Sequence, residues 1–294
     1  MKIFSNFRDP NTDPYLLHIQ NRYKDKPFTF WYDKFPSTIN ELNENPYNIL
    51  FLHEPNEFFG MHSQALTSKD HFTAILTWSD VVLNSCLNSI KFTYNGQTLD
   101  NDFIQNINNK KFKVSFLSGK TNMVEGHKLR QKVLNIKSQL TIPNMWCEVL
   151  EDFDHESNTR PGYSEYSKSL KHIPKGVDPI GYGRRVLFED FMFNVVIENV
   201  NHNNWYNKIG DNFLSKTIPI YWGCPNISEF GYDERGIIRF NTLEELIPIL
   251  NSLTPETYEK LQPFIDYNYE LAKLDTFEHN INNFFDDLIK INNI

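Results

Sequence analysis

Short apolar runs recur along the chain, and most of them lack strict alternation with polar residues. Continuous runs of this kind are typical of parallel strands covered on both faces, and the amphipathic segments between them have the spacing of helices. The predicted strands are residues 1–5, 28–32, 48–52, 73–78, 112–117, 193–198, 218–222 and 236–240. Strands that alternate with helices predict an α/β fold with mainly parallel sheets.

A polar, asparagine-rich stretch over residues 95–111 has few apolar anchors and predicts a boundary between two domains. We expect an N-terminal domain over residues 1–108 and a C-terminal domain over residues 109–294. The last part of the chain has the pattern of three helices, with Thr242 and Thr254 as N-caps. We therefore assign these helices to the C-terminal domain.

Composition narrows the class of protein. The chain has 294 residues, of which 40% are hydrophobic and 15% aromatic, which is enough for buried cores. No run of about 18 apolar residues occurs and the start lacks a signal-peptide segment, so we expect a soluble, cytoplasmic protein. Cys86, Cys147 and Cys224 are far apart, which argues against a disulfide framework or a zinc site. A net charge of -8 disfavours nucleic acid as a partner, although a local basic groove stays possible.

Residues 193–222 have the pattern of a strand, a helix and a second strand, which predicts a βαβ unit with parallel strands. The carboxyl ends of parallel strands meet at one edge of the sheet, where open α/β folds bind ligands. Glu198, Asn199, Tyr221 and Trp222 are predicted at this edge. Since neighbouring residues on a strand point to opposite faces, we expect Tyr221 to reach the ligand and Trp222 to lie in the core.

Lys208 falls in the first turn of the helix predicted over about residues 206–216. A cation at this place adds to the positive helix N-terminus, which is unfavourable unless an anion binds. This pattern favours a phosphate-binding lysine. The alternative is a solvated lysine at the start of a helix.

At these residues the sequence resembles the donor-binding signature of the α-1,3-fucosyltransferase family. The segments "FNVVIEN" and "NKIGDNFLSKTIPIYWGCPNI" are similar to its strand ending in Glu-Asn, its Tyr-x-Thr-Glu-Lys helix start and its Thr-(Ile/Val)-Pro-(Ile/Val)-Tyr-x-Gly strand. Residues 71–96 and 112–135 are similar to other parts of that family. The resemblance implies a GT-B fold with two Rossmann-like domains facing a central cleft, a nucleotide-sugar in the C-terminal domain and the acceptor on the N-terminal side.

The resemblance also implies roles for single residues. Lys208 matches the lysine of the motif, and Asn207 stands where the family has a glutamate that contacts the nucleotide ribose. Arg130, on the helix after the strand at 112–117, is given a phosphate-binding role, whereas the alternative is a surface arginine. The resemblance implies GDP-fucose as the default donor. Because Asn207 lacks the charge of the glutamate, another GDP- or UDP-sugar stays open.

A glycosyl transfer with inversion needs a base that takes the proton of the acceptor hydroxyl. Glu54 follows the strand predicted over residues 48–52, with His53 beside it and Glu57 shortly after. The resemblance likewise implies a catalytic carboxylate at the end of this strand, so Glu54 is the candidate base. The alternatives are that Glu54 is a solvated loop residue, that Glu57 is the base, and that His53 is only a packed loop histidine.

A competing fold remains open. Asp152 and Asp154 have the spacing with which metal-dependent GT-A glycosyltransferases bind a divalent ion. Arg184 and Arg185 are further candidates for phosphate binding. No other cluster of His, Cys and carboxylate residues has metal-ligand spacing, so we expect a metal-independent enzyme with no cofactor besides its nucleotide-sugar substrate.

Three functional hypotheses follow. The first is a fucosyltransferase-like enzyme that acts on a glycan or another hydroxyl acceptor. The second is a phage-type enzyme of the same fold that adds a sugar to a hydroxymethylated base in DNA, which would require a basic groove and base-flipping aromatic residues. The third is a non-catalytic nucleotide-binding module, which Glu54, Arg130 and Lys208 together disfavour.

Overall fold

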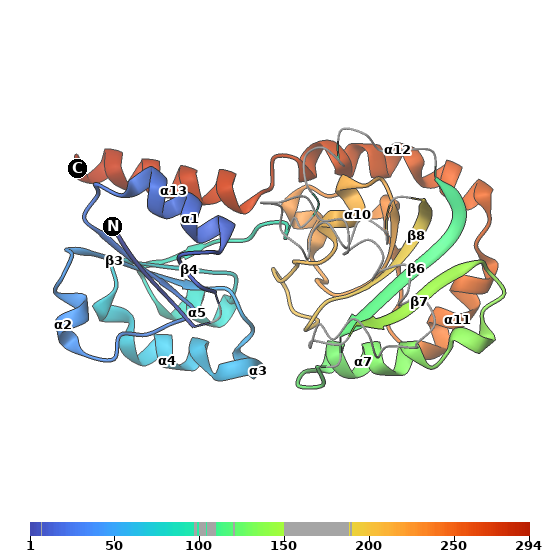
Figure 1. Cartoon of the computed structure of the whole chain (residues 1–294), viewed down its shortest axis with the longest axis horizontal. Helices are drawn as coiled ribbons and strands as arrows, with labels where there is room; N and C mark the ends of the chain where they lie inside the picture. Colours follow the sequence, from blue (N-terminus) through green and yellow to red (C-terminus); the bar gives the residue numbers. More distant parts are fainter. Residues whose placement is uncertain are drawn as a thin grey trace. The chain divides into compact units, whose positions relative to one another are not determined.

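The computed structural model describes residues 1–6, 8–96, 99, 104, 110–119, 121–149, 188 and 190–294. These residues form two compact units (Figure 1). The first unit consists of Met1–Tyr94, Asn203–Trp205 and Asp275–Ile294, and the second of Asn95–His202 and Tyr206–Leu274. Each unit is built around its own parallel sheet.

The sheet of the first unit has the strand order β1-β2-β3-β4-β5, and all neighbouring strands are parallel. Its strands are β1 (Lys2–Ser5), β2 (Phe28–Tyr32), β3 (Tyr47–Leu52), β4 (Ala74–Thr77) and β5 (Ser89–Lys91). Its helices are α1 (Pro14–Tyr23), α2 (Ile39–Leu42), α3 (Asn56–Phe59), α4 (Met61–Ser68), η1 (Lys69–His71), α5 (Asp80–Ser85) and α13 (Phe277–Asn292). The carboxyl ends of β2, β3 and β4 therefore lie next to each other.

Both faces of this sheet are buried, because successive strand residues pack into different clusters. Phe30 and Phe51 pack with α1 and α13 in one cluster, whereas Trp31 and Leu50 pack with α4 and α5 in the other. Figure 1 shows α1 and α13 side by side on one side of the sheet. Since both faces of the central strands β2, β3 and β4 are buried, the runs read as almost continuously apolar.

The sheet of the second unit has the order β10-β9-β8-β6-β7 and is also parallel throughout. Its strands are β6 (Lys111–Gly119), β7 (Asn144–Val149), β8 (Phe191–Ile197), β9 (Ile218–Trp222) and β10 (Ile238–Arg239). The helices are α7 (Glu125–Leu134), η2 (Lys137–Gln139), α10 (Gly210–Leu214), η4 (Ile227–Phe230), η5 (Glu234–Gly236), α11 (Leu243–Ser252) and α12 (Pro255–Ala272). Helix α7 packs on β6, β7 and β8, and α12 packs on β8 and β9.

The structure confirms the predicted α/β fold with parallel sheets, and it gives β2 and β9 the predicted bounds. The N-caps Thr242 and Thr254 are confirmed as well, since their hydroxyls accept from the N–H groups of Glu245 and Thr257 at 3.3 Å each. Strand β5 was not predicted. The three expected C-terminal helices are present as α11, α12 and α13.

Two sequence expectations differ from the structure. Contacts group α13 with the first unit, whereas the sequence had assigned it to the C-terminal domain. The predicted boundary at 108/109 lies outside the described residues and stays a prediction. The helix expected over about 206–216 is shorter and spans Gly210–Leu214, so Lys208 lies in the turn before it.

The described helices also bear on membrane insertion. None of those in the described part of the chain has both the length and the apolar composition needed to cross a bilayer.

Candidate functional site

The candidate donor-side residues all belong to the second unit, where the loop after β8 meets helix α7 and the end of β9. Glu198 and Asn199 directly follow β8, Tyr221 lies near the end of β9, and Arg130 lies on α7. Asn207 and Lys208 lie in the turn that leads into α10. At the carboxyl edge of the sheet, the structure joins Glu198 to Tyr221 and to the N–H groups of Asn207 and Lys208. It joins Arg130 to Asn199.

Glu198 organises the turn before α10. Its side chain is fully buried, and its Oε1 atom accepts from the backbone N–H groups of Asn207 at 3.0 Å, Lys208 at 2.8 Å and Ile209 at 3.3 Å. One carboxylate oxygen therefore satisfies the N–H groups just before α10, which begins at Gly210. N–H groups at the start of a helix have no acceptor within the helix and need one from elsewhere in the fold.

The surroundings of Glu198 raise its pKa above the ordinary value of a glutamate. Burial raises the pKa of Glu198, whereas the charge of Lys208, the backbone hydrogen bonds from Asn207 and Lys208, and the charge of Arg130 lower it. Its second oxygen, Oε2, has no hydrogen-bond partner among the described residues. The carboxyl ends of β8 and β9 thus combine a buried acid with lysine and arginine, the side chains that bind diphosphates.

Tyr221 contacts the same carboxylate oxygen of Glu198 as the N–H groups just before α10. Its side chain is fully buried, its hydroxyl donates to Glu198 Oε1 at 3.4 Å, and it accepts from the N–H of Cys224 at 3.0 Å. Trp222 is buried in the core of the unit, as expected. In this geometry Tyr221 supports the carboxylate that shapes the Lys208 turn, and a direct contact of Tyr221 with a ligand stays a prediction.

Arg130 is tied to the end of β8. Its Nη2 donates to Asn199 Oδ1 at 2.6 Å, and its Nε donates to the carbonyl of Gly126 at 3.3 Å. The N–H of Gly126 in turn donates to the carbonyl of Asn199 at 3.0 Å. A Cβ at Gly126 would lie 1.8 Å from the carbonyl oxygen of Glu198, so only glycine allows α7 to approach this loop so closely.

Glu54, the candidate base, belongs to the first unit and follows β3 by two residues. Its side chain is 27% exposed, and its Oε1 lies 4.0 Å from His53 Nε2. His53 is buried, and its Nδ1 lies 3.3 Å from the hydroxyl of Tyr94. Glu57 lies on α3 and is exposed. The structure thus places Glu54 at the carboxyl edge of its sheet, as predicted for a base.

Sequence reasoning missed Asp33, which follows β2 at the same edge. Its carboxylate is fully buried and accepts from the N–H of His53 at 2.7 Å and from the N–H of Glu54 at 3.2 Å. A polar residue directly after the apolar run at 28–32 was the available signal, the same signal that had selected Glu54 and Glu198.

Sequence reasoning also missed the aromatic residues near His53. The ring of Trp205 lies 5.1 Å from that of His53 and 5.1 Å from that of Trp78. Asn204 fixes this segment by donating to the carbonyl of Trp78 at 3.1 Å and to Asp80 at 2.8 Å. Residues 203–205 therefore complete the first unit although they follow β8 in the sequence.

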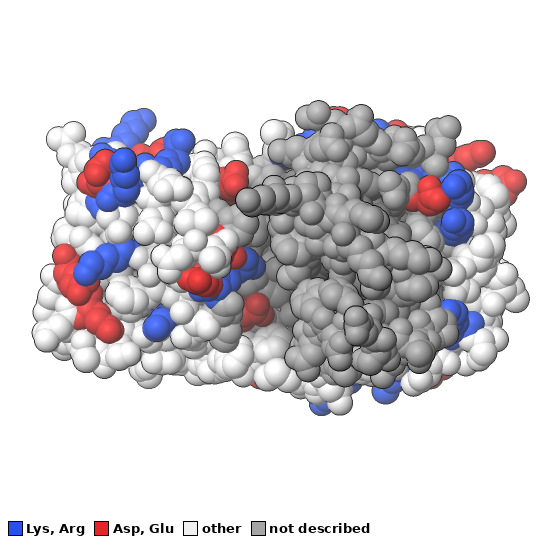
Figure 2. All heavy atoms as spheres, in the orientation of Figure 1, with Lys and Arg blue, Asp and Glu red and all other residues white. Residues whose placement is uncertain are grey.

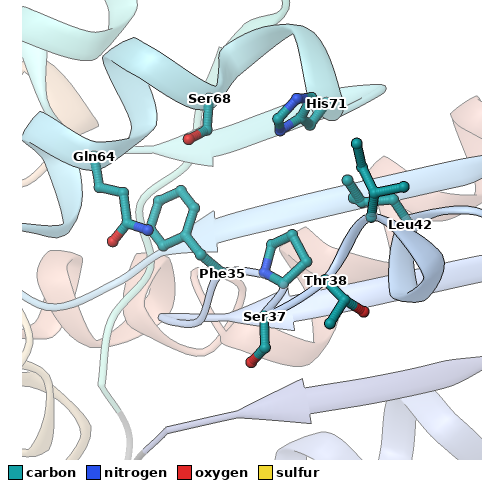
Figure 3. A pocket seen from close by; sticks show the side chains of 9 residues that line it. Phe35, Ser37, Thr38, Leu42, Gln64, Ser68 and His71 are labelled. Carbon is teal, nitrogen blue, oxygen red and sulfur yellow. The ribbon is translucent and has the colours of Figure 1, made fainter.

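A separate cavity of about 180 Å³ lies in the first unit (Figure 3). Its walls come from residues 35–39 and Leu42 on one side and from Gln64, Ser68 and His71 on the other. The predicted site residues do not line it. Its volume is below the roughly 300 to 1,000 Å³ of ordinary ligand sites, so it does not qualify as the main site.

Two other predicted features lie outside the described residues, namely the Asp152 and Asp154 pair and the Arg184 and Arg185 pair. Within the described part of the chain, no group of His, Cys, Asp and Glu has an arrangement that could hold a metal ion. The competing metal-dependent hypothesis therefore stays open.

Surface charge is mixed where it can be seen. On the face shown in Figure 2, Lys and Arg side chains of described residues lie among Asp and Glu side chains. Charges of both signs also pair within the first unit, as in the ion pairs Lys2–Glu44 and Arg22–Asp286. The described residues on this face form no continuous basic stripe of the kind that binds a phosphate backbone.

Comparison with solved structures supports this architecture. The chain is similar to Anabaena HepE in complex with UDP and glucose, with a TM-score of 0.54 and 11% identity over 96% of this chain and 82% of that chain. HepE in complex with UDP gives a TM-score of 0.53 and 12% identity over 93% of this chain and 81% of that chain. The fold is GT-B, the two-unit parallel α/β fold of many glycosyltransferases.

A third solved structure is less similar to this chain. Similarity to the GtfA/B complex covers 95% of this chain but 60% of that chain, with 8% identity and a TM-score of 0.49, which is too low to carry an argument. No family model matches the sequence, and no curated protein matches it either. Membership in the α-1,3-fucosyltransferase family therefore stays a prediction from the motifs.

Proposed function

We propose that this protein is an inverting glycosyltransferase that moves a sugar from a nucleotide-sugar to a hydroxyl acceptor. The observation that supports this proposal most directly is the distribution of charge in its GT-B fold. A partly exposed carboxylate, Glu54, follows a strand of one parallel sheet, whereas Arg130 and Lys208 surround the strand ends of the other. A base and a diphosphate-binding site are the two elements that the reaction needs.

On the donor side, Lys208 and Arg130 bind the diphosphate of the nucleotide-sugar. Glu198 holds the turn that carries Lys208, and Asn199 holds the guanidinium of Arg130 by one of its nitrogens. Asn207, through its amide, hydrogen-bonds a hydroxyl of the donor. As the sugar leaves, the two cations stabilise the charge that develops on the diphosphate, and no metal ion is required for this role.

On the acceptor side, Glu54 takes the proton of the hydroxyl. The hydroxyl oxygen then forms a bond to the anomeric carbon from the face opposite the diphosphate, and the bond between that carbon and the diphosphate oxygen breaks. The electron pair of the broken bond leaves with the diphosphate. Attack from the opposite face inverts the configuration of the sugar.

The donor and acceptor are proposed as classes. The motif resemblance favours GDP-fucose, whereas Anabaena HepE was solved with UDP, and Asn207 departs from the glutamate of the fucosyltransferase motif. We therefore propose a GDP- or UDP-sugar as donor and a glycan or another hydroxyl compound as acceptor. A hydroxymethylated base in DNA is the alternative acceptor, although the net charge of -8 does not favour it. A cytoplasmic location stays a prediction.

The test begins with donor binding. A ligand that binds only the folded protein raises its melting temperature, so the full chain is heated with each of a panel of GDP- and UDP-sugars. We expect one nucleotide series to raise the melting temperature. The matching donor is then incubated with glycans and with hydroxymethylated DNA, and the released nucleoside diphosphate is measured. Binding without release in any mixture would support the non-catalytic module, and the absence of binding by every donor would contradict the proposal.

A further inference from the structure

The backbone at the end of β2 has an unusual conformation. Asp33 has φ of 45°, in the left-handed region that residues other than glycine rarely adopt. It is fully buried, and its N–H donates to the carbonyl of Phe51 on β3 at 2.8 Å. A conformation of this kind costs free energy and persists where the surroundings hold it, often at functional sites.

The side chain of Asp33 shows what this conformation achieves. Its Oδ1 accepts from the N–H of His53 at 2.7 Å and from the N–H of Glu54 at 3.2 Å, and its Oδ2 also lies 3.2 Å from the N–H of Glu54. One buried carboxyl therefore binds the two backbone donors that follow β3. The turn that carries Glu54 is fixed from the neighbouring strand.

Other contacts hold the same turn from its carbonyl groups. Trp78 Nε1 donates to the carbonyl of His53 at 2.9 Å, and His62 Nε2 lies 3.1 Å from the carbonyl of Glu54. The backbone of Glu54 is thus held on both its N–H and its carbonyl, while its side chain remains partly exposed. A reactive side chain on an immobilised backbone is the arrangement that a positioned base requires.

We propose that Asp33 is the positioning residue of Glu54: its buried carboxyl orients the turn that carries the base and is electrostatically coupled to the base. This inference rests on the proposed function for the role of Glu54, but the coupling between the two carboxyls is measurable without turnover. Asp33 has no contact with the reacting atoms in this scheme and acts only through Glu54.

The charge state of Asp33 follows from its surroundings. Burial, and next the charge of Glu54, raise the pKa of Asp33 from its ordinary 3.8 to about 8, against the backbone hydrogen bonds and the charge of Arg8. A pKa of about 8 means that Asp33 is mostly protonated near neutral pH. Since the pKa is raised by folding, this carboxyl favours the folded state most below pH 3.8, and this contribution is lost as the pH rises through about 8.

The other charged or titratable side chains around this pair are those of Arg8, Asp13, Tyr32, His53, His62 and Tyr94. Burial raises the pKa of both tyrosines above the ordinary value of 10, so neither loses its proton near pH 8. A variant of Asp33 is needed to assign a titration in that range.

The experiment uses the full chain with ¹³C-labelled glutamate carboxyls, in which Glu54→Gln identifies the signal of Glu54. In the wild type we expect the chemical shift of this signal to change in a step near pH 8, when Asp33 ionises. Asp33→Asn cannot ionise, so the step near pH 8 should disappear, whereas the exposed Asp25→Asn should keep it. Persistence of the step in Asp33→Asn would overturn the proposal.

The rate of sugar transfer tests the positioning role of Asp33 separately. Asp33→Ala removes the acceptor of both N–H groups and should lower kcat by about 10²-fold with the donor KM unchanged, the cost of a misplaced catalytic group. Asp33→Asn keeps one acceptor oxygen and should recover part of that loss. Equal, wild-type kcat in both variants would overturn the positioning role. If the wild type transferred no sugar at all, the proposed function would fail, and the carboxyl titration would still decide whether the two acids are coupled.

Discussion

At the residue scale, the proposed chemistry depends on the charge of Glu54 and not on its shape. Glu54→Gln keeps the volume and the hydrogen-bonding capacity of the side chain but cannot accept the proton of the acceptor. We expect turnover to fall by about 10² to 10⁴, the usual contribution of a positioned base, while donor binding persists. Initial rates of nucleoside diphosphate release and calorimetric titration with the donor measure the two quantities.

Glu57 provides the matched control for this prediction. It lies on the short helix α3, is exposed, and follows Glu54 closely in the sequence. Glu57→Gln should therefore leave turnover near the wild-type rate. Normal turnover in Glu54→Gln together with a collapse in Glu57→Gln would transfer the role of base to Glu57.

Lys208 and Arg130 test the donor side. Each is proposed to form charged hydrogen bonds with the diphosphate, which contribute roughly 1.5 to 3 kcal/mol apiece. Lys208→Ala and Arg130→Ala should each weaken nucleoside diphosphate binding by that amount, measured by isothermal titration calorimetry. Lys128→Ala is the control, because this exposed lysine lies on the same helix as Arg130. Unchanged affinity in both test variants would remove the proposed phosphate site.

At the scale of elements, the position of the donor-side network depends on how closely α7 approaches the end of β8. A Cβ at Gly126 would lie 1.8 Å from the carbonyl of Glu198, and backbone atoms cannot give way cheaply. Gly126→Ala should therefore destabilise the protein by about 1 to 3 kcal/mol, the usual cost of overpacking, and should weaken nucleotide binding by displacing Arg130. Urea unfolding and calorimetry measure these effects.

Gly119, at the end of β6, is the control for that substitution. A Cβ there would meet no atom within 4 Å, and its φ is not positive. Gly119→Ala should leave both stability and nucleotide affinity close to those of the wild type. An equal loss in the two alanine variants would show that the effect comes from glycine content and not from the contact with Glu198.

The same elements show what the sequence could predict. Strands β2 and β9 were predicted with their bounds because both faces of each are buried, which leaves an uninterrupted apolar run. The helix before β9 was predicted too long, and the hydrogen bonds from the N–H groups of residues 207–209 to Glu198 could not be predicted, because the fold brings these residues together. Asp33 was missed for a similar reason, since its partners, the N–H groups of His53 and Glu54 after β3, are brought to it by the fold and are not neighbours in the sequence.

At the scale of the whole molecule, the two units contribute different charges to the proposed reaction. The carboxyl edge of the first sheet carries Asp33 and Glu54, and the network in the second unit carries Arg130 and Lys208. The position of Glu198 and Asn199 at the end of β8 was predictable from the strand pattern. Ligand sites in this type of fold lie at the carboxyl ends of parallel strands. The donor nucleotide was not predictable, since Asn207 stands where the fucosyltransferase motif has a glutamate and the Tyr and Thr positions before it do not align with this sequence.

The source of positive charge at the diphosphate distinguishes the metal-independent hypothesis from the metal-dependent one. If lysine, arginine and backbone N–H groups stabilise the leaving diphosphate, the complete protein needs no divalent ion for turnover. Dialysis against EDTA should then leave most of the transfer activity, measured with the donor that the binding panel selects. The same dialysed protein is assayed again after Mn²⁺ is added, so each sample serves as its own control. Activity that is lost in EDTA and restored by Mn²⁺ would favour the carboxylates Asp152 and Asp154 as ligands, because hard oxygen donors of that spacing bind such ions.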